Sequence, residues 1–86
     1  MRLLTTRDTG IERDAENKFV NLMEQLNKYL SKQKGVKEIE TAVLYKDFED
    51  TYRVDFEYEK EGERREGNCS LFDLQLFVSP MSVQEQ

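Results

Sequence analysis

Apolar residues recur at helical spacing in the first half of the chain. From Ala15 to Leu30 they lie three or four positions apart, which places them on one face of a helix. Thr9 and Glu12 have capping-box spacing at the start, and Gly35 stands where a left-handed C-cap residue belongs. The pattern predicts one amphipathic helix of roughly 22 residues. Its apolar positions are Ala15, Phe19, Leu22, Met23, Leu26, Tyr29 and Leu30.

The period changes to two after the helix. Apolar and polar residues alternate without interruption over residues 52–59, as in a half-buried strand. Residues 39–45 suggest a second strand, and residues 47–50 a four-residue hairpin loop between the two. This loop sets Tyr45 opposite Tyr52, Val43 opposite Val54, Thr41 opposite Phe56, Glu40 opposite Glu57 and Ile39 opposite Tyr58. We therefore expect odd positions of the first strand and even positions of the second to face the helix.

A third strand is predicted beyond a tight turn at residues 61–62. Counting back from this turn sets Gly67 opposite Phe56, Cys69 opposite Val54 and Leu71 opposite Tyr52. A glycine facing a large aromatic residue is a sensible packing pair.

Residues 71–78 admit two interpretations. Apolar residues alternate on even positions here, which indicates a strand entered through a bulge near Ser70. Ser70 and Asp73 also have capping-box spacing, which would begin a short helix. The alternation favours the strand. The pair Ser79-Pro80 resembles the start of a further helical turn.

These elements predict an α+β domain. One long N-terminal amphipathic helix packs on a three- or four-stranded antiparallel β-meander, in a single domain of residues 1–86. Residues 1–8 and 79–86 are candidate flexible tails, with Leu3 and Leu4 either docked on the core or frayed.

The composition narrows the chemistry. The 86 residues include no His, no Trp and a single Cys, and carry a formal net charge of −5. Triads that need His, His-ligated metals and an internal disulfide are therefore excluded. No apolar run approaches the ~20 residues of a membrane span, and no signal segment opens the chain, so we expect a cytoplasmic protein.

The charge is concentrated in the second half of the chain. Residues 36–78 hold six basic and twelve acidic residues, whereas residues 1–35 hold seven and five. In the expected register, the sheet face away from the helix is acidic, with Lys46, Arg53 and Arg64 interspersed. Its acidic residues are Glu38, Glu40, Asp55, Glu57, Glu59 and Glu66. This face is either a solvated surface or a platform for a basic protein partner.

The remaining candidates are weaker. Tyr45, Tyr52 and Tyr58 are expected on one sheet face, where they either pack under the helix or stack on the bases of a nucleic acid. Cys69 is expected inward as a small apolar residue. The acidic residues of the loop at 47–50 match no calcium motif, so we expect neither metal nor cofactor.

We therefore expect a small non-catalytic protein that regulates, adapts or inhibits a larger partner by protein–protein contact. The acidic sheet face and the exposed residues Phe48 and Phe77 are the candidate contacts. The alternative is a nucleic-acid-associated protein that uses the tyrosines. The apolar segment 71–78 is expected either to form a homodimer or to be covered by the N-terminal residues.

Overall fold

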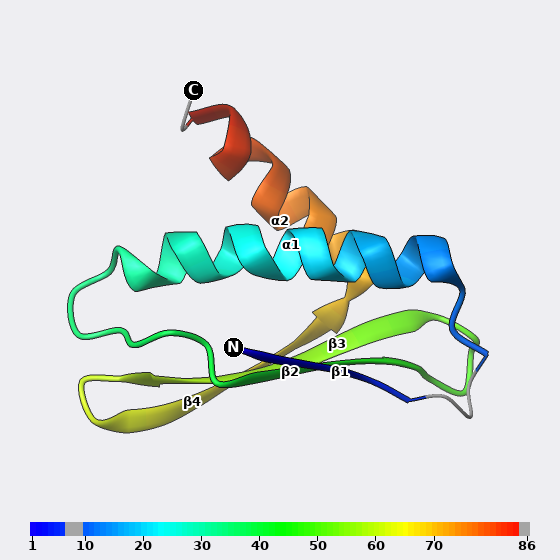
Figure 1. Cartoon of the computed structure of the whole chain (residues 1–86), viewed down its shortest axis with the longest axis horizontal. Coiled ribbons are helices and arrows are strands. Elements are labelled where there is room, and N and C mark those ends of the chain that lie inside the picture. Colours follow the sequence, from blue (N-terminus) through cyan, green and yellow to red (C-terminus); the bar gives the residue numbers. More distant parts are fainter. Residues whose placement is uncertain (7–9, 85–86) are drawn as a thin grey trace.

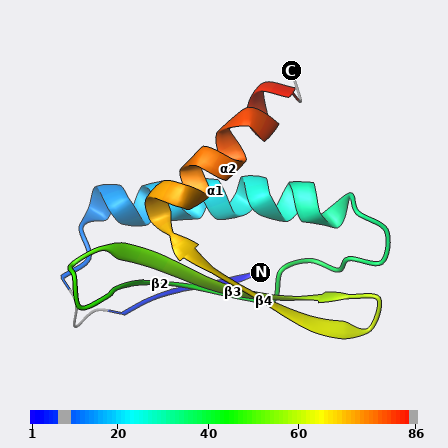
Figure 2. The ribbon, with the colours of Figure 1, turned by 180° about the vertical axis from the view of Figure 1, so that it is seen from behind.

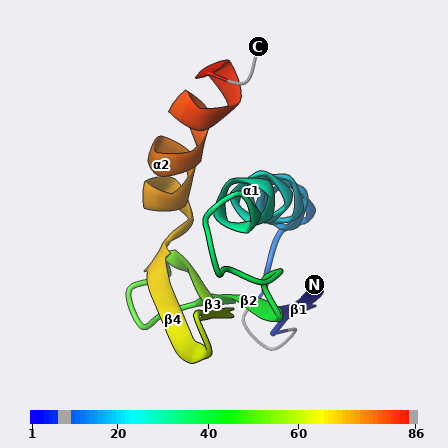
Figure 3. The same ribbon diagram turned by 90° about the vertical axis from the view of Figure 1, so that its left-hand side faces the viewer.

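A four-stranded sheet carries two helices on one of its faces (Figures 1 and 3). The computed structural model describes residues 1–6 and 10–84, with side chains described as far as residue 80. The elements, in chain order, are β1 (Arg2–Thr5), α1 (Arg13–Ser31), β2 (Thr41–Lys46), β3 (Tyr52–Lys60), β4 (Glu63–Ser70) and α2 (Leu71–Gln84). The predicted α+β class is confirmed.

The sheet is mixed rather than an antiparallel meander. Its strand order is β1-β2-β3-β4, and β1 runs parallel to β2 while the other neighbours are antiparallel. The expected N-terminal helix is therefore wrong in position, because α1 follows a strand and returns the chain across the sheet to β2. Four residues are too few for β1 to show an alternating pattern in the sequence.

Helix α1 begins later than its capping pattern suggested. Glu12 is the N-cap residue and makes no side-chain capping bond, and the helix has 19 residues instead of roughly 22. Thr9 lies outside the described residues. The backbone N–H of Glu12 donates instead to the Tyr52 hydroxyl at 2.9 Å, so a contact from β3 fixes the start of the helix. Gly35 has the expected left-handed φ of +79°, but the helix already ends at its C-cap Lys32.

The predicted register of β2 against β3 is wrong by one residue. Thr41 lies opposite Glu57 and Leu44 opposite Val54, because the connecting loop has five residues rather than four. The Asp47 carboxylate closes this loop by accepting from the N–H groups of Glu49 at 2.9 Å and Thr51 at 3.0 Å. As a result, even positions of β2 face the helix, and the apolar odd positions lie on the other face.

The register of β3 against β4 is confirmed. Phe56 lies opposite Gly67 and Val54 opposite Cys69, as the two-residue turn at Glu61 and Gly62 requires. Both turn residues have positive φ, 52° and 83°, which is the geometry of a type I′ turn. Leu71 does not extend this pairing, because β4 ends at Ser70.

Residues 71–78 belong to helix α2, so the favoured strand is wrong and the capping-box alternative holds. The Ser70 hydroxyl accepts from the N–H of Asp73 at 3.0 Å, as an N-cap does. Pro80 lies within α2 rather than at the start of a separate turn. Seen from behind, α2 rises from the end of β4 and crosses α1 (Figure 2).

The core lies between α1, the sheet and the first half of α2. Its most buried large side chains are Phe19, Met23, Ile39, Leu44, Val54 and Val78. Phe56 is half-buried at the margin of the core, where its ring stacks on Tyr58. No described helix is both long and apolar enough to cross a membrane.

Candidate functional site

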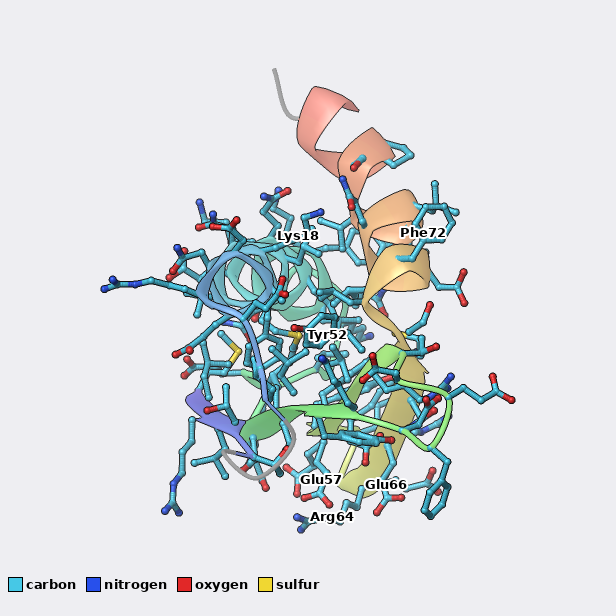
Figure 4. All side chains as sticks on the ribbon, turned by 90° about the vertical axis from the view of Figure 1, so that its right-hand side faces the viewer. Lys18, Tyr52, Glu57, Arg64, Glu66 and Phe72 are labelled. Carbon is cyan, nitrogen blue, oxygen red and sulfur yellow. The ribbon has the colours of Figure 1, made fainter. Side chains whose placement is uncertain are left out.

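The sheet face away from the helices, here called the outer face, gathers most of the predicted site residues. Val54 of β3 is fully buried on the helix side, so the odd-numbered residues of β3 point to the outer face. Their partners on β4 are even-numbered and share that face. Figure 4 shows Glu57, Arg64 and Glu66 below the sheet, with Lys18 of α1 on the opposite side.

Arg64 joins two of the predicted acidic residues. Its Nη2 donates to Glu57 Oε2 and lies 3.5 Å from Glu40 Oε2. The hydrogen bond to Glu57 is the main cause that raises the pKa of Arg64, and the negative charges of Glu57, Glu40 and, least, Glu66 add to it. Glu40 and Glu57 were expected to be direct cross-strand partners. The Glu40 N–H does donate to the Glu57 carbonyl at 2.9 Å, but the paired residue of β2 opposite Glu57 is Thr41, and the two carboxylates meet through the guanidinium.

A second network surrounds Asn68. Its amide donates to Asp55 and to the Tyr45 hydroxyl, and its carbonyl oxygen accepts from Arg53. The Tyr45 hydroxyl also donates to Asp55 Oδ1 at 3.1 Å. Asp55 is therefore held in place by the side chains of Asn68 and Tyr45.

Two further predicted residues are paired at the border of the outer face. Glu59 Oε2 lies 3.0 Å from Lys37 Nζ, and this hydrogen bond raises the pKa of Lys37. Glu38 Oε1 lies 2.9 Å from the Met1 amino group. Lys46 was expected on the outer face, but it stands opposite Tyr52, with its Nζ 4.9 Å from the centre of that ring on the helix side.

Glu66 differs from the other acidic residues of this face. It stands directly opposite Glu57 across β3 and β4, and within the described part of the chain it has no ion pair. Like charges directly opposite each other destabilise a strand pair. A shallow depression of about 390 Å³ lies beside the pair. It is lined by Asp55, Phe56, Glu57, Glu66, Gly67 and Asn68.

The tyrosines do not share one face. Tyr45 lies on the outer face with Asp55, whereas Tyr52 and Tyr58 pack against the core on the helix side. The expected common face is wrong, because β2 is shifted by one residue against β3. Three stacked bases would therefore find no common tyrosine surface.

Cys69 is half-buried on the helix side of β4. Burial is the main cause that raises the pKa of its thiol, and the charge of Asp73 adds to it. A reactive thiolate needs the opposite shift. Among the described residues, no cluster of potential ligands is arranged to hold a metal ion.

The two predicted exposed hydrophobic residues lie on different elements. Phe48 is fully exposed in the loop between β2 and β3, and Phe77 is half-exposed on α2 with its ring edge-on to Tyr29. Phe72 and Leu76 are also exposed on α2; the sequence interpretation included them in the apolar segment 71–78 but did not name them as contact residues. The signal was present in the composition, since Asp73 is the one charged residue in the 14 positions of this helix.

In comparisons with known proteins, no family model matches the chain, and no curated protein or solved structure matches it significantly.

Proposed function

We propose that this chain is a non-catalytic cytoplasmic protein that acts by protein–protein contact, as a regulator, adaptor or inhibitor of a larger partner. The contact surface is the outer face of the sheet, and the partner presents a basic surface to it. The observation that carries the proposal is the position of Glu66, opposite Glu57 at the edge of a depression that Asp55 also lines.

The electrostatics of the depression favour a cation from outside the chain. Glu57 is held by Arg64 and Asp55 by Asn68, so these carboxylates are already oriented. Among the described residues no hydrogen bond or ion pair holds the Glu66 carboxylate, although it feels the charge of Arg64, so it can accept from a lysine or arginine of another protein without breaking an internal bond. A cation placed there would also relieve the repulsion between Glu57 and Glu66.

The chemistry of the chain supports a non-catalytic role. The chain has no His, and burial disfavours the thiolate of its single Cys. The depression is shallow and lies on an open sheet face, whereas hydrolytic carboxylate pairs work in a cleft that encloses the substrate.

Affinity capture from native lysate of the source cells, with and without nuclease, tests the class of partner. The control bait is an unrelated tagged protein with the same net charge of −5, which removes generic binding to acidic surfaces. We expect a protein that is retained after nuclease treatment and is absent from the control. Capture that disappears with nuclease would instead support the nucleic-acid-associated alternative.

A further inference from the structure

Helix α2 carries exposed apolar residues on the side away from the core, where the only ring contact among the described residues is that of Phe77 with Tyr29 of α1. Leu71, Leu74 and Val78 are buried against the rest of the molecule. The opposite side exposes Phe72 by 67%, Leu76 by 59% and Phe77 by 54%. These three residues are called the α2 ridge here. A helix that is apolar around most of its circumference is typical of an element buried on both sides.

We propose that the α2 ridge is the interface of a homodimer, in which two copies of α2 pack antiparallel about a twofold axis near Leu76. A twofold interface brings the same patch together from both copies, so the patch must be complementary to itself. The three ridge residues are uncharged, and Asp73 beside them is the one charged residue on this side of α2. The inference does not depend on the proposed function of the outer face.

The charge distribution favours a second copy over a charged partner. Asp73 is the only charged residue of α2, and the cores of homodimer interfaces are apolar and depleted in charge. In the antiparallel arrangement the two Asp73 residues lie on opposite sides of the twofold axis, each three residues from Leu76. At a rise of about 1.5 Å per residue, they are about 9 Å apart along the helix direction.

The placement of α2 keeps the acidic surfaces of the two copies apart. The helix rises from the sheet on the side of α1, and its C-terminal part extends beyond α1 (Figures 1 and 3). The outer face lies on the opposite side of the sheet (Figure 4). A dimer through α2 therefore turns both outer faces outward, which limits repulsion between two chains of net charge −5.

The exposed area of the α2 ridge limits the dimer to modest affinity. At about 200 Å² for a free aromatic side chain, Phe72 and Phe77 together offer roughly 240 Å² per copy. The smallest biological interfaces need about 500 Å² per copy. Leu76, which is 59% exposed, and the exposed neighbours Asp73 and Pro80 add to this area. We therefore expect a dissociation constant in the micromolar range rather than an obligate dimer.

Sedimentation equilibrium at several concentrations tests the dimer directly. The wild-type chain should approach twice its monomer mass of 10.2 kDa as concentration rises. Leu76→Glu should raise the dissociation constant by at least about tenfold, because it buries two unpaired carboxylates at the axis. The matched control is Phe48→Ser, which removes a fully exposed aromatic residue elsewhere and should leave the mass unchanged.

Cross-linking gives a second readout that does not require Leu76→Glu to fold. In a Cys69→Ser background, Leu76→Cys should form a disulfide-linked dimer much faster than Phe48→Cys. Equal rates would overturn the proposal. So would a wild-type chain that stays monomeric at hundreds of micromolar, or a dimer that Leu76→Glu leaves intact. A monomeric chain that loses a captured protein on Leu76→Glu would assign the ridge to a different protein.

Discussion

The ring of Phe56 lies directly over Gly67, its cross-strand partner on β4. A Cβ atom at position 67 would overlap three atoms of this ring, although the glycine has an ordinary strand conformation. The glycine is therefore required for the space that its missing side chain leaves. The pair fixes the position of Phe56 at the margin of the core.

Gly67→Ala should lower the free energy of unfolding by about 1–3 kcal/mol, as overpacking does. The cause is the ring, so Phe56→Leu should relieve much of the penalty. Urea denaturation of the two single variants and the double variant measures the coupling between the positions. Strict additivity would show that the ring does not occupy this space.

Truncating two neighbouring residues of β2 tests which of its faces packs against the helix. Leu44 is fully buried on the helix side, whereas Val43 lies on the outer face. Leu44→Ala should therefore cost about 2–5 kcal/mol of unfolding free energy. Val43→Ala, on the partly solvated side, should cost about 1 kcal/mol or less. Equal urea midpoints for the two variants, or a larger loss for Val43→Ala, would contradict this register and support the expected one, in which Val43 lies opposite Val54.

The cap of α2 should contribute measurably to stability. Ser70→Ala removes the acceptor of the Asp73 N–H and should cost about 0.5–2 kcal/mol. Ser70→Asp keeps an acceptor and should retain most of the stability, whereas Ser79→Ala within the helix is the matched control. Thermal or urea unfolding of the three variants measures the difference. A loss that Ser70→Asp does not restore would argue against the cap.

Cys69 should be a slow nucleophile in the folded chain. Because burial raises its pKa, the folded thiol keeps its proton at a pH where the unfolded chain has begun to lose it. Stability should accordingly fall as the pH rises through that window. Iodoacetamide labelling across pH, with the urea-unfolded chain as reference, should show a higher midpoint for the folded protein. An equal or lower midpoint would contradict the burial of this thiol.

The sequence determines β3 and β4 well and β2 poorly, for a physical reason. In β3 the apolar residues all stand at even-numbered positions, and the turn at Glu61 and Gly62 has one favoured geometry. The pairing of β3 with β4 therefore follows from neighbouring residues alone. In β2, residues 42–45 are all apolar, and both parities can face a core. Ile39, just before the strand, is also buried and its N–H donates to Asn27 of α1 at 2.8 Å, although its parity is opposite to that of Ala42 and Leu44. No pattern within the strand shows which of the two parities faces the helix.

Helix α2 shows how a short apolar segment can carry two periods at once. Phe72, Leu74, Leu76 and Val78 alternate as in a strand, while Leu71, Leu74 and Val78 have helical spacing. The bond between Ser70 and Asp73 and the packing against α1 select the helix. The outer face could be predicted in part, because Asp55, Glu57 and Glu66 follow from β3 and β4 alone. The bridging of Glu40 and Glu57 by Arg64 is a side-chain contact that the strand pattern alone does not show.

The most direct test of the proposed contact surface is a comparison of Glu66→Lys with Glu24→Lys. Both reverse one exposed charge, but Glu24 lies on α1, away from the sheet. Glu66→Lys places a cation opposite Glu57, so its unfolding free energy should be unchanged or raised by a fraction of a kcal/mol. Capture of the protein partner, measured after nuclease treatment, should fall about tenfold for Glu66→Lys and stay near wild type for Glu24→Lys. The difference should shrink at high salt. Full capture by a folded Glu66→Lys variant would contradict the assignment of the outer face as the binding surface.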